Sequence, residues 1–364
     1  HIDVEGGKLK SEHHPLGLVA ILGPFNFPLH IPNGHMLPAL LAGNSIILKP
    51  SILTPLTAIY MIKLLYQTDL PKGLVGLIQG GADLAQHLIQ SKAINGICFT
   101  GSSHVGLKIK NQISAHTLLA LECGGNNPII IGANSDWKSV LNNVILSSFI
   151  SSGQRCTCAR RAYLIKDKVP KSFLKDLSKQ VKCIKIGSYL EKPEPFMGPL
   201  IHKNAAQQVL DFQKHRIQEG AIPITLSKRI ENHPCLIQIG ILDCSGLVDL
   251  DIEVFGPLLQ IYWVDSIQEA IALSKNSQYG LSTAVISEDP MDFDTVYQNI
   301  PSGLINWNCP STGASSMLPF GGVKSSGNYR PTAYYAADYC SYPVTSKQFP
   351  KLPKNQSLPP GLPL

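Results

Sequence analysis

The sequence predicts an α/β protein in which parallel strands alternate with helices. Short apolar runs bounded by glycine and proline alternate with helical segments from Leu16 to Leu121, and the alternation resumes after Cys156. With 364 residues, of which 44% are hydrophobic, the chain can bury a large core, and we expect two domains.

Apolar runs mark the strands of the first half, which we place at residues 18–22, 45–48, 74–78 and 97–100. A helix follows the second run, with Thr54 as its N-cap and Pro55 at its first position. Gly101 to Gly106 then form a glycine-bearing turn between a strand and a helix. Such a turn directs main-chain N–H groups toward a phosphate, although its spacing differs from the G-x-G-x-x-G pattern.

The second half opens with a helix that starts after Ser135, its expected N-cap, and carries apolar residues at helical spacing as far as Phe149. Later helices are expected at residues 170–181, 205–219 and 266–274. Strands are expected at 162–165, 258–264, 281–286 and 303–307, with short strands and loops at 222–246.

Cys156, in the stretch FISSGQRCTCARR, is the candidate nucleophile. A thiol acts as a nucleophile through its thiolate, which needs an electropositive and partly open site. Gly153 permits a tight turn just before it, and Arg155 and Arg160 place positive charge nearby. The C-x-C pair formed with Cys158 has no second pair in the sequence, so we expect no metal site.

Glu122, in the stretch LLALECGGNNP, is the candidate general base. Its small neighbours Gly124 and Gly125 leave the carboxylate room to move, and a carboxylate beside a thioester can activate water against it. Cys156 and Glu122 together predict covalent acyl chemistry followed by hydrolysis.

The composition argues against several classes of protein. The formal charge of +6 comes from scattered basic residues, so nucleic-acid binding is not expected. No apolar run reaches the ~18 residues of a membrane helix. An odd count of nine cysteines, in a chain too long to need disulfides, favours a cytoplasmic location.

These motifs resemble the aldehyde dehydrogenases. LECGGNNP is similar to the glutamate signature of that family, and FISSGQRC is similar to its cysteine signature. Further matches, in the order of the family, are GPFNFP, LKPS, FTGSSHVG, EVFGP and PFGGVKSSG.

The resemblance implies an aldehyde dehydrogenase-like fold with a Rossmann-like cofactor domain, an α/β catalytic domain and a small oligomerisation segment. We place part of an oligomerisation hairpin at 1–12 and the dinucleotide-binding domain, with its front part missing, at 13–123. The catalytic domain is placed at 124–320. Residues 321–364 are expected to return to the cofactor domain and to form an oligomerisation strand and a proline-rich tail. The chain begins at His1, whereas the family has a helical stretch upstream, so we expect a fragment.

The resemblance also assigns roles to residues. Asn26 is expected to bind the oxyanion together with the main-chain N–H of Cys156. The cofactor-binding residues are expected to be Lys49, Gly101, Ser102, Ser103, His104, Val105, Gly106, Glu253 and Phe255. NAD is the expected cofactor, but the family's ribose-binding glutamate is replaced here by Ile52, which leaves NADP open.

The stretches GQRCTCARR, NFPLHIPNGH, INWN and RPTAYYAADYC resemble a subgroup whose aldehyde carries two carboxylates. Arginine is the usual planar partner of a carboxylate, and in the family the position just before the cysteine lines the substrate tunnel. The resemblance therefore makes Arg155 the predicted substrate-binding residue, together with Thr157. Arg160, Arg161, Lys324 and Arg330 are alternatives. The loop 308–320 is expected at the mouth of the substrate site.

Three functions compete on these residues. They are hydrolytic oxidation of an anionic aldehyde by a homo-oligomeric enzyme, transfer of the acyl group to coenzyme A, and a non-catalytic protein that keeps the fold. Glu122 argues against the second function, because transfer to coenzyme A needs no base to activate water. Asn26, Glu122 and Cys156 together argue against the third.

Overall fold

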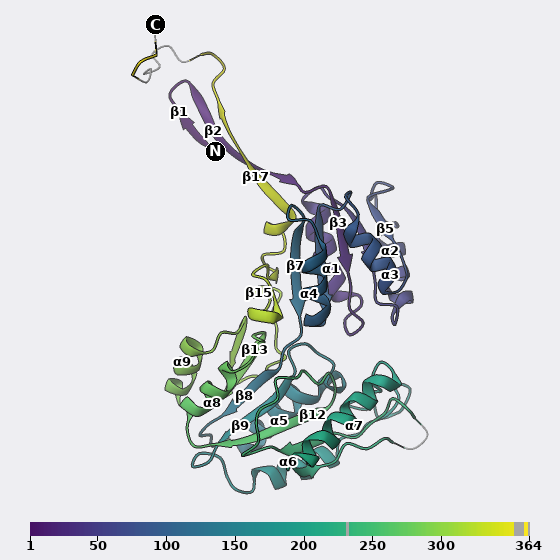
Figure 1. Cartoon of the computed structure of the whole chain (residues 1–364), viewed down its shortest axis with the longest axis vertical. Coiled ribbons are helices and arrows are strands. Elements are labelled where there is room, and N and C mark those ends of the chain that lie inside the picture. Colours follow the sequence, from purple (N-terminus) through teal and green to yellow (C-terminus); the bar gives the residue numbers. More distant parts are fainter. Residues whose placement is uncertain (231–232, 353–359, 363–364) are drawn as a thin grey trace.

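A computed structural model of the chain describes residues 1–230, 233–352 and 360–362. Within these residues two large sheets and one extended, smaller sheet carry the architecture (Figure 1). The five-stranded sheet lies between the extended sheet and the seven-stranded sheet, and helices flank both large sheets. The predicted α/β class is therefore confirmed.

The five-stranded sheet is parallel, in the order β5-β4-β3-β6-β7. Its strands are β3 (Leu18–Leu22), β4 (Ser45–Lys49), β5 (Val75–Leu77), β6 (Gly96–Gly101) and β7 (Leu118–Cys123). The chain runs outward from β3 to β5 and then returns to β6 on the other side of β3. In parallel α/β sheets, ligands bind beyond the carboxyl ends of the strands at such a reversal.

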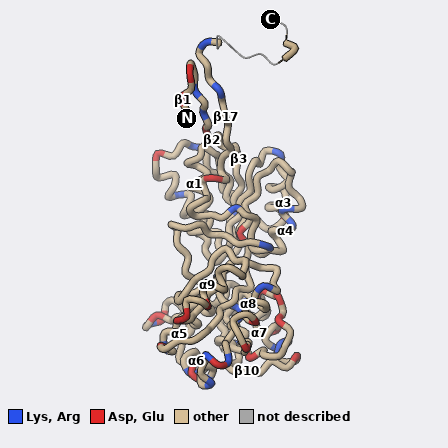
Figure 2. Tube along the Cα trace, turned by 90° about the vertical axis from the view of Figure 1, so that its left-hand side faces the viewer, with Lys and Arg blue, Asp and Glu red and all other residues tan. Residues whose placement is uncertain are grey.

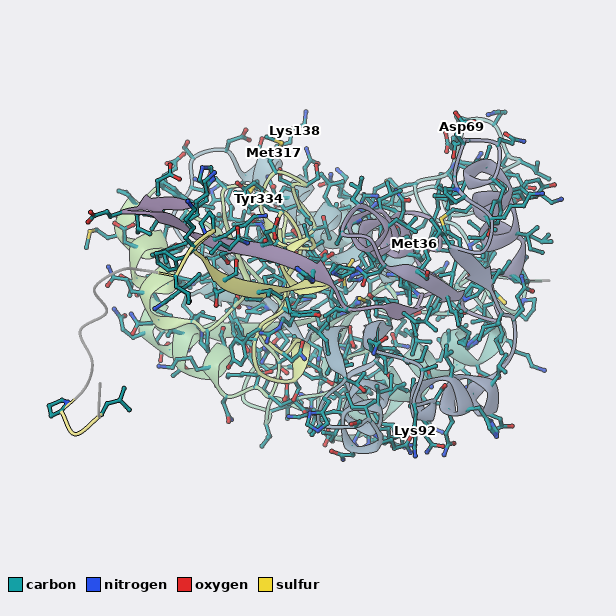
Figure 3. The ribbon with its side chains drawn as sticks, turned by 90° about the horizontal axis from the view of Figure 1, so that it is seen from above. Met36, Asp69, Lys92, Lys138, Met317 and Tyr334 are labelled. Atoms are coloured by element: carbon teal, nitrogen blue, oxygen red, sulfur yellow. The ribbon has the colours of Figure 1, made fainter. Side chains whose placement is uncertain are left out.

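Two pairs of helices cover the two faces of this sheet. α1 (His30–Leu41) and α2 (Pro55–Leu65) cover one face, and α3 (Ala82–Gln90) and α4 (Ser103–Gln112) cover the other. Successive side chains of a strand point to opposite faces, so Val19 packs with the first pair of helices and Ala20 with the second. Met36 of α1, labelled in Figure 3, is fully buried against the first face.

The seven-stranded sheet has the order β10-β11-β12-β9-β8-β13-β14, and only β10 runs antiparallel to its neighbour. Its strands are β8 (Asn127–Ile131), β9 (Ala159–Ile165), β10 (Ile222–Thr225), β11 (Gly240–Asp243), β12 (Leu258–Val264), β13 (Ser282–Ile286) and β14 (Leu304–Trp307). One face packs against α5 (Trp137–Phe149) and α6 (Phe173–Lys182), and the other against α7 (Lys203–Gln218), α8 (Ile267–Lys275) and α9 (Pro290–Asn299).

The third sheet joins the two ends of the chain. β2 (Gly7–Pro15) pairs antiparallel with β1 (Ile2–Val4) and with β17 (Ser341–Gln348), and the three strands extend away from the large sheets in Figure 1. Another antiparallel pair joins β15 (Pro319–Phe320), at the end of the predicted mouth loop, to β16 (Thr332–Ala333).

The prediction of a proline-rich tail is corrected in part by this arrangement. Pro343 lies inside β17, where an edge strand tolerates a residue that cannot donate to the ladder. Pro343 is therefore part of a paired strand and does not belong to the tail. Pro353, Pro359 and Pro363 lie outside the described residues.

One predicted helix start needs correction, and another is confirmed by position. The N-cap of α5 is Asp136 and not Ser135, because the Asp136 carboxylate accepts a hydrogen bond of 3.1 Å from the main-chain N–H of Ser139. Thr54 is the N-cap of α2 by position, and Pro55 is its first residue, but the Thr54 side chain makes no capping hydrogen bond. Local sequence offers several polar residues before a helix, and only the backbone geometry selects one of them.

Basic and acidic residues lie interspersed along the trace in Figure 2. Over the part of the chain that the structure describes, no helix combines the length and apolar character needed to cross a membrane.

Candidate active site

A cleft with a volume of about 740 Å³ opens between the two large sheets. One wall is formed at the carboxyl ends of β3, β4, β6 and β7, by residues that include Lys49, Gly101 and Glu122. The opposite wall comes from the loops of the seven-stranded sheet that carry Cys156 and Glu253. The volume falls within the range of about 300–1,000 Å³ that is usual for small-molecule and cofactor sites.

The loop that carries Cys156 starts with a left-handed turn. After α5 ends, Ser151, Ser152 and Gly153 have φ values of 53°, 57° and 69°. A Cβ atom on Gly153 would lie 2.3 Å from the carbonyl oxygen of Gly256, so only glycine fits this position. The turn places Cys156 against the cleft, seven residues beyond the end of α5.

Four side chains hold the carbonyl groups of this loop. The donors are Asn26 to Gln154 at 2.9 Å, Arg160 to Arg155 at 3.0 Å, Asn127 to Cys156 at 2.6 Å and to Cys158 at 2.9 Å, and Ser311 to Thr157 at 2.8 Å. They come from four different parts of the chain. Because both large sheets contribute donors, the position of the thiol depends on how the whole molecule is assembled.

The environment of Cys156 keeps its thiol protonated at neutral pH. Burial, together with the negative charges of Glu122 and Glu253, raises the pKa of the thiol to about 12, and a main-chain N–H of Thr157 opposes this rise. A thiolate therefore forms only when a base removes the proton or when positive charge enters the cleft.

Two donors are available for an oxyanion beside this sulfur. The Asn26 amide donates one N–H to the carbonyl of Gln154 and has a second N–H left to donate. Among the residues described here, neither a carbonyl oxygen nor a side chain accepts a hydrogen bond from the main-chain N–H of Cys156. The structure thus brings Asn26 and Cys156 together at the cleft.

Glu122 is the last residue but one of β7 and is 3% exposed. Burial raises the pKa of its carboxyl to about 8, and a main-chain hydrogen bond from Thr332 opposes the rise. Within the described part of the chain its Oε1 atom has no hydrogen-bond partner, and the same holds for the hydroxyl of Thr100, which also lines the cleft. Buried polar atoms without partners at a cleft indicate that a ligand or water completes their hydrogen bonds.

Lys49 closes the end of β4 and donates to the carbonyl groups of Pro50 at 2.6 Å and Gly80 at 3.2 Å. Burial lowers the pKa of its ammonium group. Ile52 lines the cleft nearby with 61% of its surface exposed, so the cleft has an apolar side chain where the family has a carboxylate.

The glycine-bearing turn lies at the cleft only in part. Gly101, Ser102 and Val105 line it, and the Ser102 hydroxyl caps α4 by accepting a hydrogen bond from Val105. Three other members of the predicted set, Ser103, His104 and Gly106, are not among the residues that line the described cleft. Gly106 instead allows α4 to pack closely on β7, since a Cβ atom there would lie 2.8 Å from the Cys123 sulfur.

Glu253 and Phe255 form the opposite wall. Glu253 accepts a hydrogen bond of 3.1 Å from the main-chain N–H of Gly125, and it covers Gly124 so closely that a Cβ atom there would clash with the carboxylate. Phe255 meets Phe25 edge to face, with 5.9 Å between ring centroids.

The two predicted substrate residues lie outside the set that lines the described cleft. The Arg155 guanidinium lies over the ring of Phe27 at 5.1 Å, and its Nε donates to the Ser151 hydroxyl at 3.0 Å. Thr157 is buried. Met317 of the mouth loop, labelled in Figure 3, is 77% exposed, so this loop reaches the surface.

Several residues of the site escaped the sequence prediction, namely Asn127, Gln154 and Ser311. Asn127 lies within the glutamate signature LECGGNNP, and Gln154 lies two residues before the nucleophile, so the position of each in a motif could have indicated it. Ser311 had none, because its contact with Thr157 spans 154 positions of the sequence.

The sequence matches the aldehyde dehydrogenase family over residues 2–345. The chain belongs to the aldehyde dehydrogenase family. Among curated relatives of this aldehyde dehydrogenase, two are named N-succinylglutamate 5-semialdehyde dehydrogenase. The relative from Chromobacterium violaceum is 42% identical over 352 residues, which cover 96% of this chain and 72% of the relative. The relative from Serratia proteamaculans is 42% identical over 353 residues, with the same coverage of 96% and 72%.

Solved structures show the same fold. The glyceraldehyde-3-phosphate dehydrogenase of Methanocaldococcus jannaschii, complexed with NADP, is 28% identical with a TM-score of 0.88, over 96% of this chain and 76% of that one. Betaine aldehyde dehydrogenase of Staphylococcus aureus, in complex with NAD+, is 26% identical with a TM-score of 0.88, over 94% of this chain and 69% of that one. The family uses nicotinamide cofactors, and the unpartnered atoms of Thr100 and Glu122 together with the glycine turn make the cleft of this enzyme fit such a group.

Proposed function

We propose that this aldehyde dehydrogenase oxidises N-succinyl-L-glutamate 5-semialdehyde to N-succinyl-L-glutamate, with NAD as the electron acceptor, as a step of arginine catabolism by succinylation. The observation that carries the proposal is the meeting of Asn26, Glu122 and Cys156 in one cleft of a chain that is 42% identical to relatives with that name. The substrate is assigned from those relatives, and the chemistry is assigned from the cleft.

In the first half of the proposed reaction, the Cys156 thiol gives its proton to water, a loss that the positive charge of a bound nicotinamide would favour. The sulfur bonds to the aldehyde carbon, and the carbonyl oxygen becomes an oxyanion. The Asn26 amide and the main-chain N–H of Cys156 stabilise this oxyanion, at about 2.7–4 kcal/mol per donor by comparison with other oxyanion holes. A bound nicotinamide supplies the acceptor for the hydride that leaves the same carbon. The carbon is then held as a thioester on Cys156.

In the second half, Glu122 accepts a proton from water as the water attacks the thioester carbon. The carbon–sulfur bond breaks, the thiol of Cys156 is restored and the carboxylic acid leaves. With a pKa of about 8, the Glu122 carboxylate is a stronger base than an ordinary carboxylate, and its ionised fraction, which is small at neutral pH and grows toward pH 8, performs this step. A buried glutamate here favours water over coenzyme A as the acyl acceptor.

The choice of NAD over NADP is part of the proposal, and one observation favours the alternative. Ile52 replaces the carboxylate that would accept hydrogen bonds from both ribose hydroxyls and repel a 2′-phosphate. Lys49 lies beside this position and can donate to a hydroxyl or to a phosphate.

We further propose that Arg155 binds a carboxylate of the substrate. Its guanidinium lies over Phe27, which follows directly after Asn26, and among the described residues its two Nη groups donate no hydrogen bond. The enzyme is proposed to be a cytoplasmic homo-oligomer that assembles through the extended sheet of β1, β2 and β17, whose strands stand clear of the large sheets.

The test of the proposed function is the formation of NADH and NADPH with N-succinylglutamate semialdehyde, comparing the protein with its Cys156→Ala variant. Cys183→Ala is a matched control, because Cys183 is an exposed cysteine at the end of α6. We expect turnover with NAD that disappears only in Cys156→Ala. A folded protein that leaves this aldehyde unreacted with both cofactors would overturn the proposal.

A further inference from the structure

Arg160 lies between the loop of the nucleophile and the loop of the opposite wall. It belongs to β9 and is 1% exposed. Its Nη2 donates to the carbonyl of Arg155 at 3.0 Å, and its Nη1 donates to the carbonyl of Gly256 at 3.2 Å. One guanidinium therefore joins the residue before Cys156 to the loop that carries Glu253 and Phe255.

The neighbouring arginine is held in a different way. Arg161 is equally buried, but it forms an ion pair of 2.6 Å with Asp249 and donates to the carbonyl of Asn126. Arg160 forms no ion pair with a carboxylate among the described residues, and its Nε atom has no partner there. Burying a guanidinium without a contacting carboxylate is unfavourable, and arginine cannot relieve this by losing its proton.

Two features of the opposite wall compensate this charge. The guanidinium lies 5.3 Å from the centre of the Phe255 ring, which is within the range of a cation–π contact. Its charge also acts on Glu253: burial raises the pKa of that carboxyl, while Arg160 and the main-chain N–H of Gly125 lower it.

Arg160 is the cation whose charge lowers the pKa of the Glu253 carboxyl. The negative charge of Glu253 contributes to a raised pKa in four other titratable groups, namely Cys123, Cys156, Cys158 and Tyr279. Burial raises the pKa of each of them, so all four are uncharged at neutral pH. Glu122 lines the same cleft and, with a pKa of about 8, is mostly protonated there.

We propose that Arg160 is a positioning residue that fixes the Glu253–Gly256 loop against the nucleophile loop, and so holds Glu253 and Phe255 in place for cofactor binding. The proposal rests on the proposed nicotinamide-dependent function, and it assigns Arg160 no contact with the aldehyde. It also explains why a charged residue is buried at this position: an uncharged side chain of the same length would leave both carbonyl groups without a donor and Glu253 without a counter-charge.

The test measures cofactor binding directly, by calorimetric titration of the protein with NAD and with NADP in the absence of aldehyde. In Arg160→Met we expect the Kd at neutral pH to rise by about tenfold or more, as loss of a nearby opposite charge shifts a carboxyl pKa by about one unit or more. We also expect the fall in affinity on acidification to begin at a higher pH than in the unaltered protein, because the Glu253 pKa rises.

Arg160→Lys is the second variant, and it keeps the test valid if Arg160→Met does not fold. Lysine retains the charge but cannot reach both carbonyl groups with a planar fork, so we expect a raised Kd with an unchanged pH midpoint. Arg216→Lys is the matched control, since it alters an equally buried arginine that pairs with Glu219 and does not line the cleft; we expect its Kd and its pH midpoint to stay unchanged in folded protein.

Folded Arg160 variants with the Kd and the pH midpoint of the unaltered protein would overturn the proposal. If the unaltered protein bound neither cofactor, the proposed function would fail as well. Failure of the Arg160 proposal alone is recognised by tight cofactor binding that none of the Arg160 variants changes.

Discussion

The side-chain amide of Asn26 donates a hydrogen bond of 2.9 Å to the main-chain carbonyl of Gln154. Asn26 follows β3 of the five-stranded sheet, whereas Gln154 precedes Cys156 in a loop of the seven-stranded sheet. One asparagine therefore ties the nucleophile loop to the other half of the molecule, and it lines the same cleft as the nucleophile.

Replacing Asn26 by Asp is expected to lower kcat by about 10²–10³-fold, the usual loss for one oxyanion-hole donor. Aspartate has nearly the same shape, but it cannot donate a hydrogen bond when ionised, and its charge repels an oxyanion. Steady-state kinetics of aldehyde oxidation measures the change. Asn299→Asp is the control, because this exposed asparagine at the end of α9 also donates to a carbonyl and should leave kcat unaltered.

Thioester hydrolysis is expected to accelerate with pH and to level off above about pH 8. Burial raises the Glu122 pKa to about 8, and below that pH the carboxyl is protonated and cannot accept a proton from water. Glu122→Gln should retain a first burst of reduced cofactor but lose the following steady phase. Rapid-mixing measurements between pH 6 and pH 9 follow both phases. An unchanged steady phase in Glu122→Gln would exclude Glu122 as the base.

The same carboxyl is expected to make folding stability depend on pH. Its pKa in the folded state, about 8, lies above the ordinary value of 4.5. The folded state therefore binds the proton more tightly than the unfolded state, and this contribution to stability is complete below pH 4.5 and is lost as the pH rises through 8. Compared with the unaltered protein, Glu122→Gln should gain stability at pH 9 relative to pH 5, by an amount on the order of a few kcal/mol. Thermal denaturation at the two pH values tests this; an equal difference in Tm at both would contradict it.

Introducing a carboxylate at position 52 is expected to shift cofactor preference toward NAD. Ile52 is exposed at the cleft, so Ile52→Glu needs no repacking of the core. The new carboxylate can accept hydrogen bonds from both ribose hydroxyls and repel a 2′-phosphate. The ratio of kcat/KM for NAD to that for NADP should rise by about tenfold or more, whereas Ile52→Gln, which adds no charge, should change it much less. An unchanged ratio in Ile52→Glu would place the adenosine ribose elsewhere.

Much of the fold was predictable because the apolar runs that form the strands end at or beside residues with predicted roles. The runs that form β4, β6 and β7 end at or next to Lys49, Gly101 and Glu122, and parallel strands bring these ends to one edge. The resemblance to a known family then supplied the roles of those residues. The boundaries of the domains stay predictions, although β7 and β8 belong to different sheets.

The contacts that shape the nucleophile loop were not predictable. Ser151 and Ser152 adopt positive φ values that serine rarely takes, and nothing in the local sequence signals them. The proposed role of Arg160 depends on Gly256, a residue 96 positions away in the sequence. Such contacts exist only after both sheets have formed, so local patterns carry no information about them.

Arg155 is expected to select the charge of the aldehyde. Its guanidinium lies over Phe27, and its Nε is bonded to the Ser151 hydroxyl, so the side chain is held in place before substrate arrives. Arg155→Leu should raise KM for N-succinylglutamate semialdehyde by about tenfold or more, the usual effect of losing a charge-assisted hydrogen bond. KM for an uncharged aldehyde of similar length should stay the same. Arg155→Lys keeps the charge but not the planar fork and should fall between the two. Equal effects on the charged and the uncharged aldehyde would mean that Arg155 supports the loop through Ser151 and does not bind the carboxylate.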